Sequence, residues 1–247
     1  MKLNRHWNAV LALGVAALTI TGRNAEAQKS QLHPSFYGSA EADTHHGQVY
    51  LLGMYVGIGG LGWSPYFNVN AYNLHYRLLQ SQQSLTAVLP TLGMAYAGRR
   101  SGVSFGAGCA WVNNDDAGAP GAEGGGSDGV TASVGAYHNG TGSRPLHTQL
   151  LGSYNFGSQY VWARGRASVP FGTSRRHPAR VGAEIVGQGG GKNGLTSSVF
   201  EAGPTLEYQW TPNFRTTGVV GYKSIGGYSV TSTTSAAYFK LEFSYSP

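Results

Sequence analysis

Charged residues of both signs recur at alternate positions in the last third of this 247-residue chain. In the stretch YVWARGRASV, Arg164 and Arg166 lie two residues apart among small and apolar neighbours. Residues two apart in a β-strand point to the same face, so both guanidinium groups share one face. The neighbouring segments continue this spacing with further bases and with acids. The full set is Arg164, Arg166, Arg180, Glu184, Glu201, Glu207, Arg215, Lys223, Lys240 and Glu242.

Opposite charges on neighbouring strands can pair with each other or contact a polar solute. We interpret these ten residues as a charge ladder that faces the interior of a barrel. Two roles stay open at this point: the pairs can fill a narrow lumen, or they can line a pore and set its selectivity. Three aromatic residues share the inward face and can pack against arginine or contact a sugar chain: Tyr160, Trp162 and Tyr238.

Other groups of chemically active residues give weaker signals. The acids of the glycine-rich segment 113–129 favour a solvated loop over a calcium site. His45 and His46 are adjacent and have no third ligand nearby in the sequence, so a turn is favoured over a metal site. Cys109 is the single cysteine and shares a strand face with Phe105 and Trp111. We expect it to be a small apolar residue and not a reactive thiol.

A lipid-modifying enzyme would need a serine, a histidine and an acid at the rim of the barrel. No G-x-S-x-G motif is present, and no serine–histidine pair stands out by its spacing. The available histidines include His75, His138, His147 and His177. We therefore predict no catalytic residue, no metal and no cofactor.

Composition favours an exterior that faces lipid. Only 11% of the residues are charged and 38 are glycine, whereas ordinary soluble domains have about 25% charged residues and about 7% glycine. The 15 tyrosines, 9 phenylalanines and 5 tryptophans indicate an ordered protein. The net charge of +6 is spread along the chain, so we predict no nucleic-acid partner.

Residues 1–27 are typical of a cleaved signal peptide. Lys2 and Arg5 begin the segment, an apolar run of about a dozen residues follows, and Ala25-Glu26-Ala27 matches a cleavage site. We therefore predict a signal peptide over 1–27 and one barrel domain over 28–247. After the signal peptide, no apolar run is long enough for a membrane-spanning helix.

Period-two alternation recurs between clusters of turn-forming residues, which is the pattern of β-strands. It predicts an all-β fold of about twelve strands, with a range of ten to fourteen. The expected strands cover 35–43, 48–58, 63–76, 84–98, 102–112, 129–139, 146–155, 159–169, 180–187, 196–209, 214–224 and 234–245. With the apolar face outward, this is a closed antiparallel transmembrane β-barrel, because an open sheet edge in lipid would leave backbone groups unpaired.

The ends of the strands fit the same architecture. Aromatic residues near these ends suit the two membrane interfaces: Trp63, Tyr66, Trp111, Tyr208, Trp210 and Tyr245. The long segment 113–129 suits an external loop, and the short turn 211–213 suits the periplasmic side.

Several segments resemble the cellulose biosynthesis protein BcsS family, a small outer-membrane β-barrel of bacterial cellulose-synthesis operons. The resemblance lies in GVTASVGAYHNGTGSRPLHTQLLGSYNFGSQYVWARGRASV (129–169), VGAEIVGQGG (181–190) and FEAGPTLEYQWTPNFRTTGVVGYKS (200–224), and SFYGSAEADTHHGQVYLLGMYVGIGG (35–60) has a similar layout. It implies a place in the outer membrane of a Gram-negative bacterium and a link to cellulose production or secretion. It implies no reaction.

The expected function is that of a non-enzymatic outer-membrane accessory to cellulose or exopolysaccharide biosynthesis and secretion. Its partners would be outer-membrane lipid and either cellulose or the cellulose synthase and export machinery. A general small-solute porin is the first alternative, and a lipid-modifying outer-membrane enzyme is the second.

Overall fold

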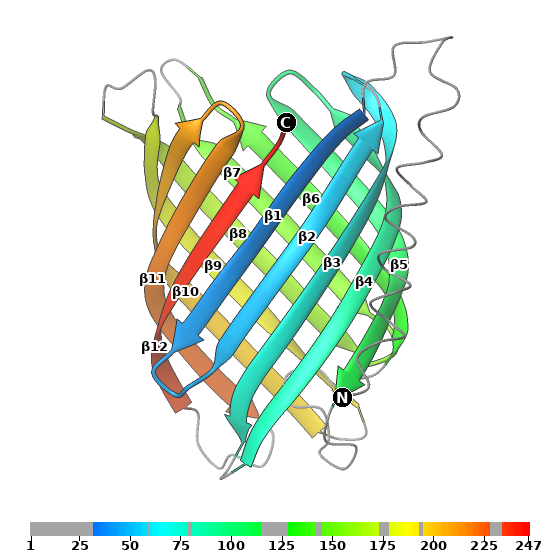
Figure 1. The fold of residues 1–247 in the computed structure, drawn as a ribbon, viewed down its shortest axis with the longest axis vertical. Helices are drawn as coiled ribbons and strands as arrows, with labels where there is room; N and C mark the ends of the chain where they lie inside the picture. The colour runs from blue at the N-terminus through cyan, green and yellow to red at the C-terminus, as the bar shows by residue number, and fades with distance from the viewer. Residues whose placement is uncertain are drawn as a thin grey trace. The chain divides into compact units, whose positions relative to one another are not determined.

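The chain folds into a closed barrel of twelve antiparallel strands (Figure 1). The computed structural model describes residues 32–58, 60–78, 81–114, 128–141, 145–172, 178–192, 195–227 and 234–247. The expected signal peptide and the acids Asp115, Asp116 and Glu123 lie outside these residues.

The strands are β1 (Leu32–Asp43), β2 (Gln48–Ile58), β3 (Gly62–Leu78), β4 (Ser81–Ala97), β5 (Ser101–Asn114), β6 (Gly129–Asn139), β7 (His147–Asn155), β8 (Tyr160–Phe171), β9 (Ala179–Lys192), β10 (Leu195–Thr211), β11 (Phe214–Gly227) and β12 (Thr234–Tyr245).

Each strand pairs with its neighbours in sequence, and β1 pairs with β12 to close the sheet. The closing register places Glu41 opposite Lys240 and Asp43 opposite Tyr238. With an even number of strands, both ends of the barrel domain, Leu32 and Pro247, lie at one end of the barrel. We call this the terminal end, and the turn at 212–213 lies there too. β5 ends and β6 begins at the opposite end (Figure 1), and most of the predicted external loop 113–129 lies outside the described residues.

The strand number and order confirm the predicted fold, and only some strand ends differ. The largest difference is in β9, which was expected to stop at residue 187 and extends to Lys192. The segment GQGGGK looks like a turn because glycine punctuates loops. Its backbone nevertheless continues the ladder, with Gln188 opposite Val199 and Gly190 opposite Ser197. A hydrogen bond of 2.5 Å from the Tyr160 hydroxyl to Gln188 Oε1 also fixes this part of β9.

Exposure is inverted relative to a soluble protein. Leu92 is 68% exposed and Val134 is 63% exposed on the outer face, whereas Glu184 is 1% exposed and Lys223 is 3% exposed on the inner face. Among the described side chains, no Asp, Glu, Lys or Arg occupies the outer face of a strand. Such an exterior is stable in hydrocarbon and unstable in water, so the barrel spans a membrane. Within the described residues, no helix is long and apolar enough to cross a membrane.

Aromatic residues cluster on the outer face near the terminal end. Trp63 packs against Tyr96 and Phe105, with ring centroids 5.4 and 5.8 Å apart, and Tyr208 packs against Trp210 at 4.7 Å. The prediction for Tyr66 was wrong, because its side chain points inward and is 8% exposed. Trp63 and Tyr66 are an odd number of residues apart, so they must lie on opposite faces of β3.

We predict that an arginine placed on the outer face destabilises the barrel, and that the loss of stability grows with the depth of the arginine in the membrane. Val134 is in the middle of β6 and Val130 is near its start, and both point outward. Val134→Arg should lower the free energy of unfolding by about 2–4 kcal/mol, and Val130→Arg by about 0–1 kcal/mol. Urea unfolding in lipid vesicles measures both. Equal costs for the two variants would contradict the assigned membrane position.

Candidate functional site: the charged lumen

All ten residues of the predicted ladder lie on the inner face, where they form three groups. The Glu184 group contains Arg164, Arg166, Glu184, Lys240 and Glu242. The Lys223 group contains Lys223 and Glu201 together with Glu41 and Asp43, and the Glu207 group contains Arg180, Glu207 and Arg215. The ladder is therefore a set of compact clusters and not a continuous line of pairs.

The Glu184 group connects strands that are not neighbours. On β8, Arg164 binds Glu242 of β12 at 2.9 Å and Arg166 binds the same carboxylate at 2.7 Å. Arg166 also donates through Nε to Glu184 of β9 at 3.0 Å, and Lys240 of β12 donates to the other oxygen of that carboxylate. Because three strands separate β8 from β12 in the sheet, these side chains extend across part of the lumen.

The Lys223 group places one ammonium among three carboxylates. Lys223 Nζ lies 3.0 Å from Glu41, 3.5 Å from Asp43 and 3.4 Å from Glu201, and all four side chains are almost fully buried. Asp43 has a second role, since its Oδ1 accepts hydrogen bonds from the backbone N–H groups of His45 and Gly47. The group therefore joins β1, β10 and β11 and also fixes the turn after β1.

Glu41 and Asp43 were missed by the sequence analysis. The sequence signal was present, because in AEAD (40–43) the two acids alternate with alanines. The predicted ladder had six cations but only four carboxylates. With the two acids of β1, the three groups of the described lumen contain six cations and six carboxylates. This balance matters because an unpaired buried charge is strongly destabilising.

The Glu207 group is nearer the terminal end and more exposed. Arg180 of β9 binds Glu207 of β10 at 2.6 Å, and Arg215 of β11 lies 3.4 Å from the same carboxylate. The Arg215 side chain is 41% exposed, whereas the side chain of Glu184 is fully buried. These pairs join adjacent strands and therefore lie along the wall.

The three predicted lumen aromatics also face inward, and two of them lie beside cations. The Arg164 guanidinium lies 6.0 Å from the Trp162 ring centroid, and Lys240 Nζ lies 5.9 Å from that of Tyr238. The Tyr238 hydroxyl and Thr205 Oγ1 are buried without a hydrogen-bond partner among the described residues. Buried hydroxyls of this kind are usually satisfied by ordered water, so we expect water within this side of the lumen.

The opposite wall of the lumen, on β5 to β7, carries small uncharged residues. Ser104 and Gly106 on β5, Ser133 on β6 and Ser153 on β7 face inward and are partly accessible. The lumen therefore has a filled, charged side on β8 to β12 and β1, and a more open, uncharged side on β5 to β7.

The remaining groups weighed in the sequence give no competing site in the described residues. His45 Nε2 contacts the Ser235 backbone oxygen at 2.8 Å, and His147 Nδ1 contacts Asn139 Oδ1 at 3.2 Å. His46 adopts a positive φ of 66° in the turn after β1, as a turn residue can. Cys109 is exposed on the outer face. No metal-binding cluster occurs among the described side chains.

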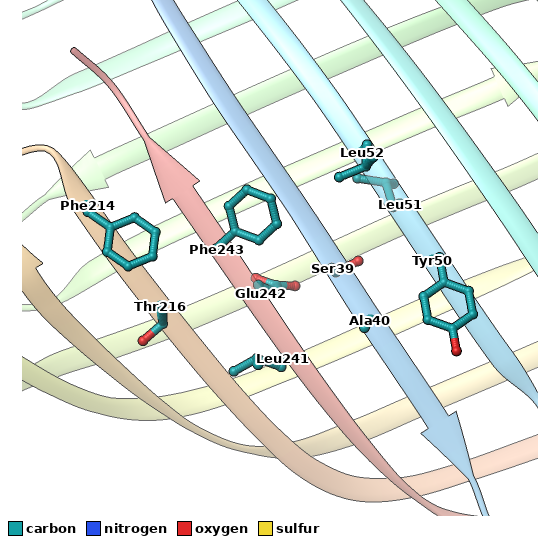
Figure 2. Close-up of a pocket in the computed structure, with 10 residues that line it drawn as sticks. All are labelled: Ser39, Ala40, Tyr50, Leu51, Leu52, Phe214, Thr216, Leu241, Glu242 and Phe243. Atoms are coloured by element: carbon teal, nitrogen blue, oxygen red, sulfur yellow. The ribbon is translucent and has the colours of Figure 1, made fainter. Parts of the chain in front are cut away.

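The outer face carries a groove of about 590 Å³ over β11, β12, β1 and β2 (Figure 2). Its wall is largely apolar and includes Phe214, Leu241, Phe243, Tyr50 and Leu52. These residues alternate with the lumen-facing ones along the same strands, so the groove faces lipid. It lies outside the charged lumen.

Comparison with known proteins supports the fold and leaves the activity open. No protein-family model matches the chain, and no curated protein matches it in sequence. The structure of LpxR from Salmonella typhimurium superposes with a TM-score of 0.52 at 11% identity, covering 85% of this chain and 99% of that one. The β-domain of the Bordetella autotransporter BrkA superposes with a TM-score of 0.49 at 9% sequence identity, covering 88% of this chain and 99% of that one. The KdgM porin superposes with a TM-score of 0.45 at 10% sequence identity, covering 85% of this chain and 98% of that one. The likeness to LpxR shows a shared barrel fold alone, so the resemblance to the cellulose-operon family stays a prediction.

We predict that Glu184→Gln is strongly destabilising. The change leaves Arg166 and Lys240 buried beside a neutral amide, and removal of one partner from a buried ion pair costs about 3–5 kcal/mol. Unfolding by urea in lipid vesicles measures this loss. Adding Lys240→Met should restore part of the stability, because it removes one of the unpaired charges.

Arg215→Gln provides the matched control. It also removes one charge from an ion pair, but at a partly exposed position, so its cost should be below about 1 kcal/mol. A cost as large as that of Glu184→Gln would show that the two groups do not differ in burial as described.

Proposed function

We propose that the protein is a narrow outer-membrane channel for small polar solutes. The supporting observation is the asymmetric lumen. The Glu184 group extends from β8 to β12 and restricts one side, whereas the wall of β5 to β7 is uncharged, small and partly accessible. The charges of the three groups balance overall, so the passage would admit polar solutes with little preference for either sign of charge.

The outer-membrane location follows from the barrel and its exterior. Closed barrels with apolar outer faces are the β-structures that span membranes. The expected signal peptide would direct export of the chain across the inner membrane. A non-enzymatic role stays a prediction. In its support, the ring contacts of His45 and His147 are to a backbone oxygen and an amide oxygen, whereas a catalytic triad joins histidine to a serine and an acid.

We predict that removing the crossing pair widens the channel. Arg164→Ala with Glu242→Ala deletes one cation and one carboxylate that join non-adjacent strands, so single-channel conductance in planar bilayers should rise. Arg180→Ala with Glu207→Ala is the matched control. It removes the same two charges from neighbouring strands, where the pair lies along the wall, and should change the conductance less.

Two results would argue against a channel. One is the absence of conductance in both the wild-type protein and the Arg164→Ala/Glu242→Ala variant, provided that both are folded barrels. The other is an equal rise in conductance for the two double variants, which would show that the Glu184 group does not restrict the passage.

A second candidate function is an accessory role in cellulose or exopolysaccharide secretion. The resemblance of residues 129–169 and 200–224 to the cellulose-operon barrel family favours it, as do the inward aromatics Tyr160 and Trp162 beside Arg164. Cellulose or the synthase and export machinery would then be the partner. Deletion of the gene, with cellulose assayed outside the cell and in the periplasm, tests this role. We expect less extracellular cellulose or more periplasmic glucan, and no change in either would exclude it.

A further inference from the structure

Tyrosine rings pack against glycines on the uncharged part of the lumen wall. A Cβ atom added to Gly53 would collide with the Tyr37 ring, one added to Gly93 with the Tyr66 ring, and one added to Gly102 with the Tyr137 ring. Each ring therefore occupies the space that a side chain on the neighbouring strand would otherwise fill. A glycine at these positions therefore makes room for an aromatic ring against the wall.

Two of these tyrosines, Tyr66 and Tyr137, lie near the terminal end of the barrel together with a further one, Tyr55. Tyr55 and Tyr66 are stacked, with ring centroids 5.2 Å apart and an interplanar angle of 24°. Tyr66 is 8% exposed, whereas Tyr137 is 39% exposed. Tyr55 is close to the end of β2, Tyr66 to the start of β3 and Tyr137 to the end of β6. We call Tyr55, Tyr66 and Tyr137 the tyrosine platform. Tyr55 and Tyr137 supply its accessible faces, and Tyr66 supports Tyr55.

Amide groups lie beside the platform, one step further into the lumen. The Tyr37 hydroxyl is 2.7 Å from Asn68 Oδ1 and 2.6 Å from Asn70 Oδ1. The hydroxyl is the donor in both contacts, so its hydrogen is shared between the two amide oxygens. The two asparagines are thereby held in place, and each amide carries both donor and acceptor atoms on the lumen wall.

Formal charge is missing from this part of the wall. Among the described inward side chains of β2 to β7, none is Asp, Glu, Lys or Arg. The Glu184 group has three cations and two carboxylates, and each of its cations already binds a carboxylate. A charged ligand at the platform would therefore lose hydration without gaining a partner on this wall. A ligand that suits it is uncharged, has one apolar face and carries hydroxyl groups around its edge.

We propose that the tyrosine platform, with Asn68 and Asn70, is a binding site for an uncharged oligosaccharide built from pyranose rings. The C–H groups on one face of such a ring carry partial positive charge and complement the negative face of tyrosine. The hydroxyls of the sugar would exchange hydrogen bonds with the two amides. The site would hold a sugar at the terminal mouth before or after passage. Passage of the sugar through the barrel rests on the proposed channel function. Binding of the sugar to the platform does not require that the barrel conducts.

The test is a titration of the purified full-length barrel with cellotriose and maltotriose, followed by calorimetry and by tyrosine fluorescence. The detergent must have no sugar headgroup, because such a headgroup would compete for the site. We expect at least one of the two sugars to bind. Tyr55→Leu and Tyr137→Leu should each raise the Kd roughly three- to tenfold, as expected for loss of one aromatic contact.

Two control variants separate recognition from folding. Tyr55→Phe keeps the ring and should bind nearly as well as the wild type. Tyr222→Leu removes a tyrosine from the outer face, where it is 53% exposed, and should leave binding unchanged. A charged trimer, trigalacturonate, should bind more weakly than the neutral sugars.

The proposal is overturned if neither neutral sugar binds the wild-type barrel, or if folded Tyr55→Leu and Tyr137→Leu barrels bind as the wild type does. The rings would then serve only to cover glycine backbone. Equal or tighter binding of trigalacturonate would overturn the assignment to uncharged sugars. Because binding is measured in detergent, a barrel that binds sugar without conducting would refute the channel and leave the platform standing.

Discussion

Closure of the sheet between β1 and β12 is the interaction on which the rest of the structure depends. In hydrocarbon, every backbone N–H and C=O group needs a partner within the protein, and this last pairing removes the two free edges. It also has an electrostatic consequence. Closure brings Glu41 and Asp43 of β1 next to the basic residues of β11 and β12. The same event that satisfies the backbone thereby completes the charge balance of the lumen.

The periodicity of the sequence was sufficient to predict much of this fold. Alternation defined which side chains face inward on β8 to β12, because that rule depends only on strand geometry. The partners of those side chains could not be predicted with the same rule. Arg166 binds a residue of β12, and that choice depends on strand tilt and on the curvature of the closed sheet. Local alternation contains no information on either quantity.

The errors also have local physical causes. Residues 188–192 were expected to form a turn because of their glycines, yet a strand needs only backbone groups to continue its ladder. Tyr66 was grouped with Trp63 because both lie near a strand end, although their odd spacing places them on opposite faces. Glu41 and Asp43 lie on the first strand, far in the sequence from the charged residues of β8 to β12, and only closure of the barrel makes the first strand a neighbour of the last.

The unequal distribution of charge and glycine around the barrel follows from the volume that side chains need. Arginine and lysine that extend across a lumen require open space in front of them. Small residues on β5 to β7 leave that space, and a second set of long charged side chains there would fill it. The tyrosines of β1, β3 and β6 also need space, and each takes it by packing against a glycine of a neighbouring strand. The high glycine content is thus linked to the charge ladder: glycine keeps one wall thin and polar while the opposite wall carries the ion pairs.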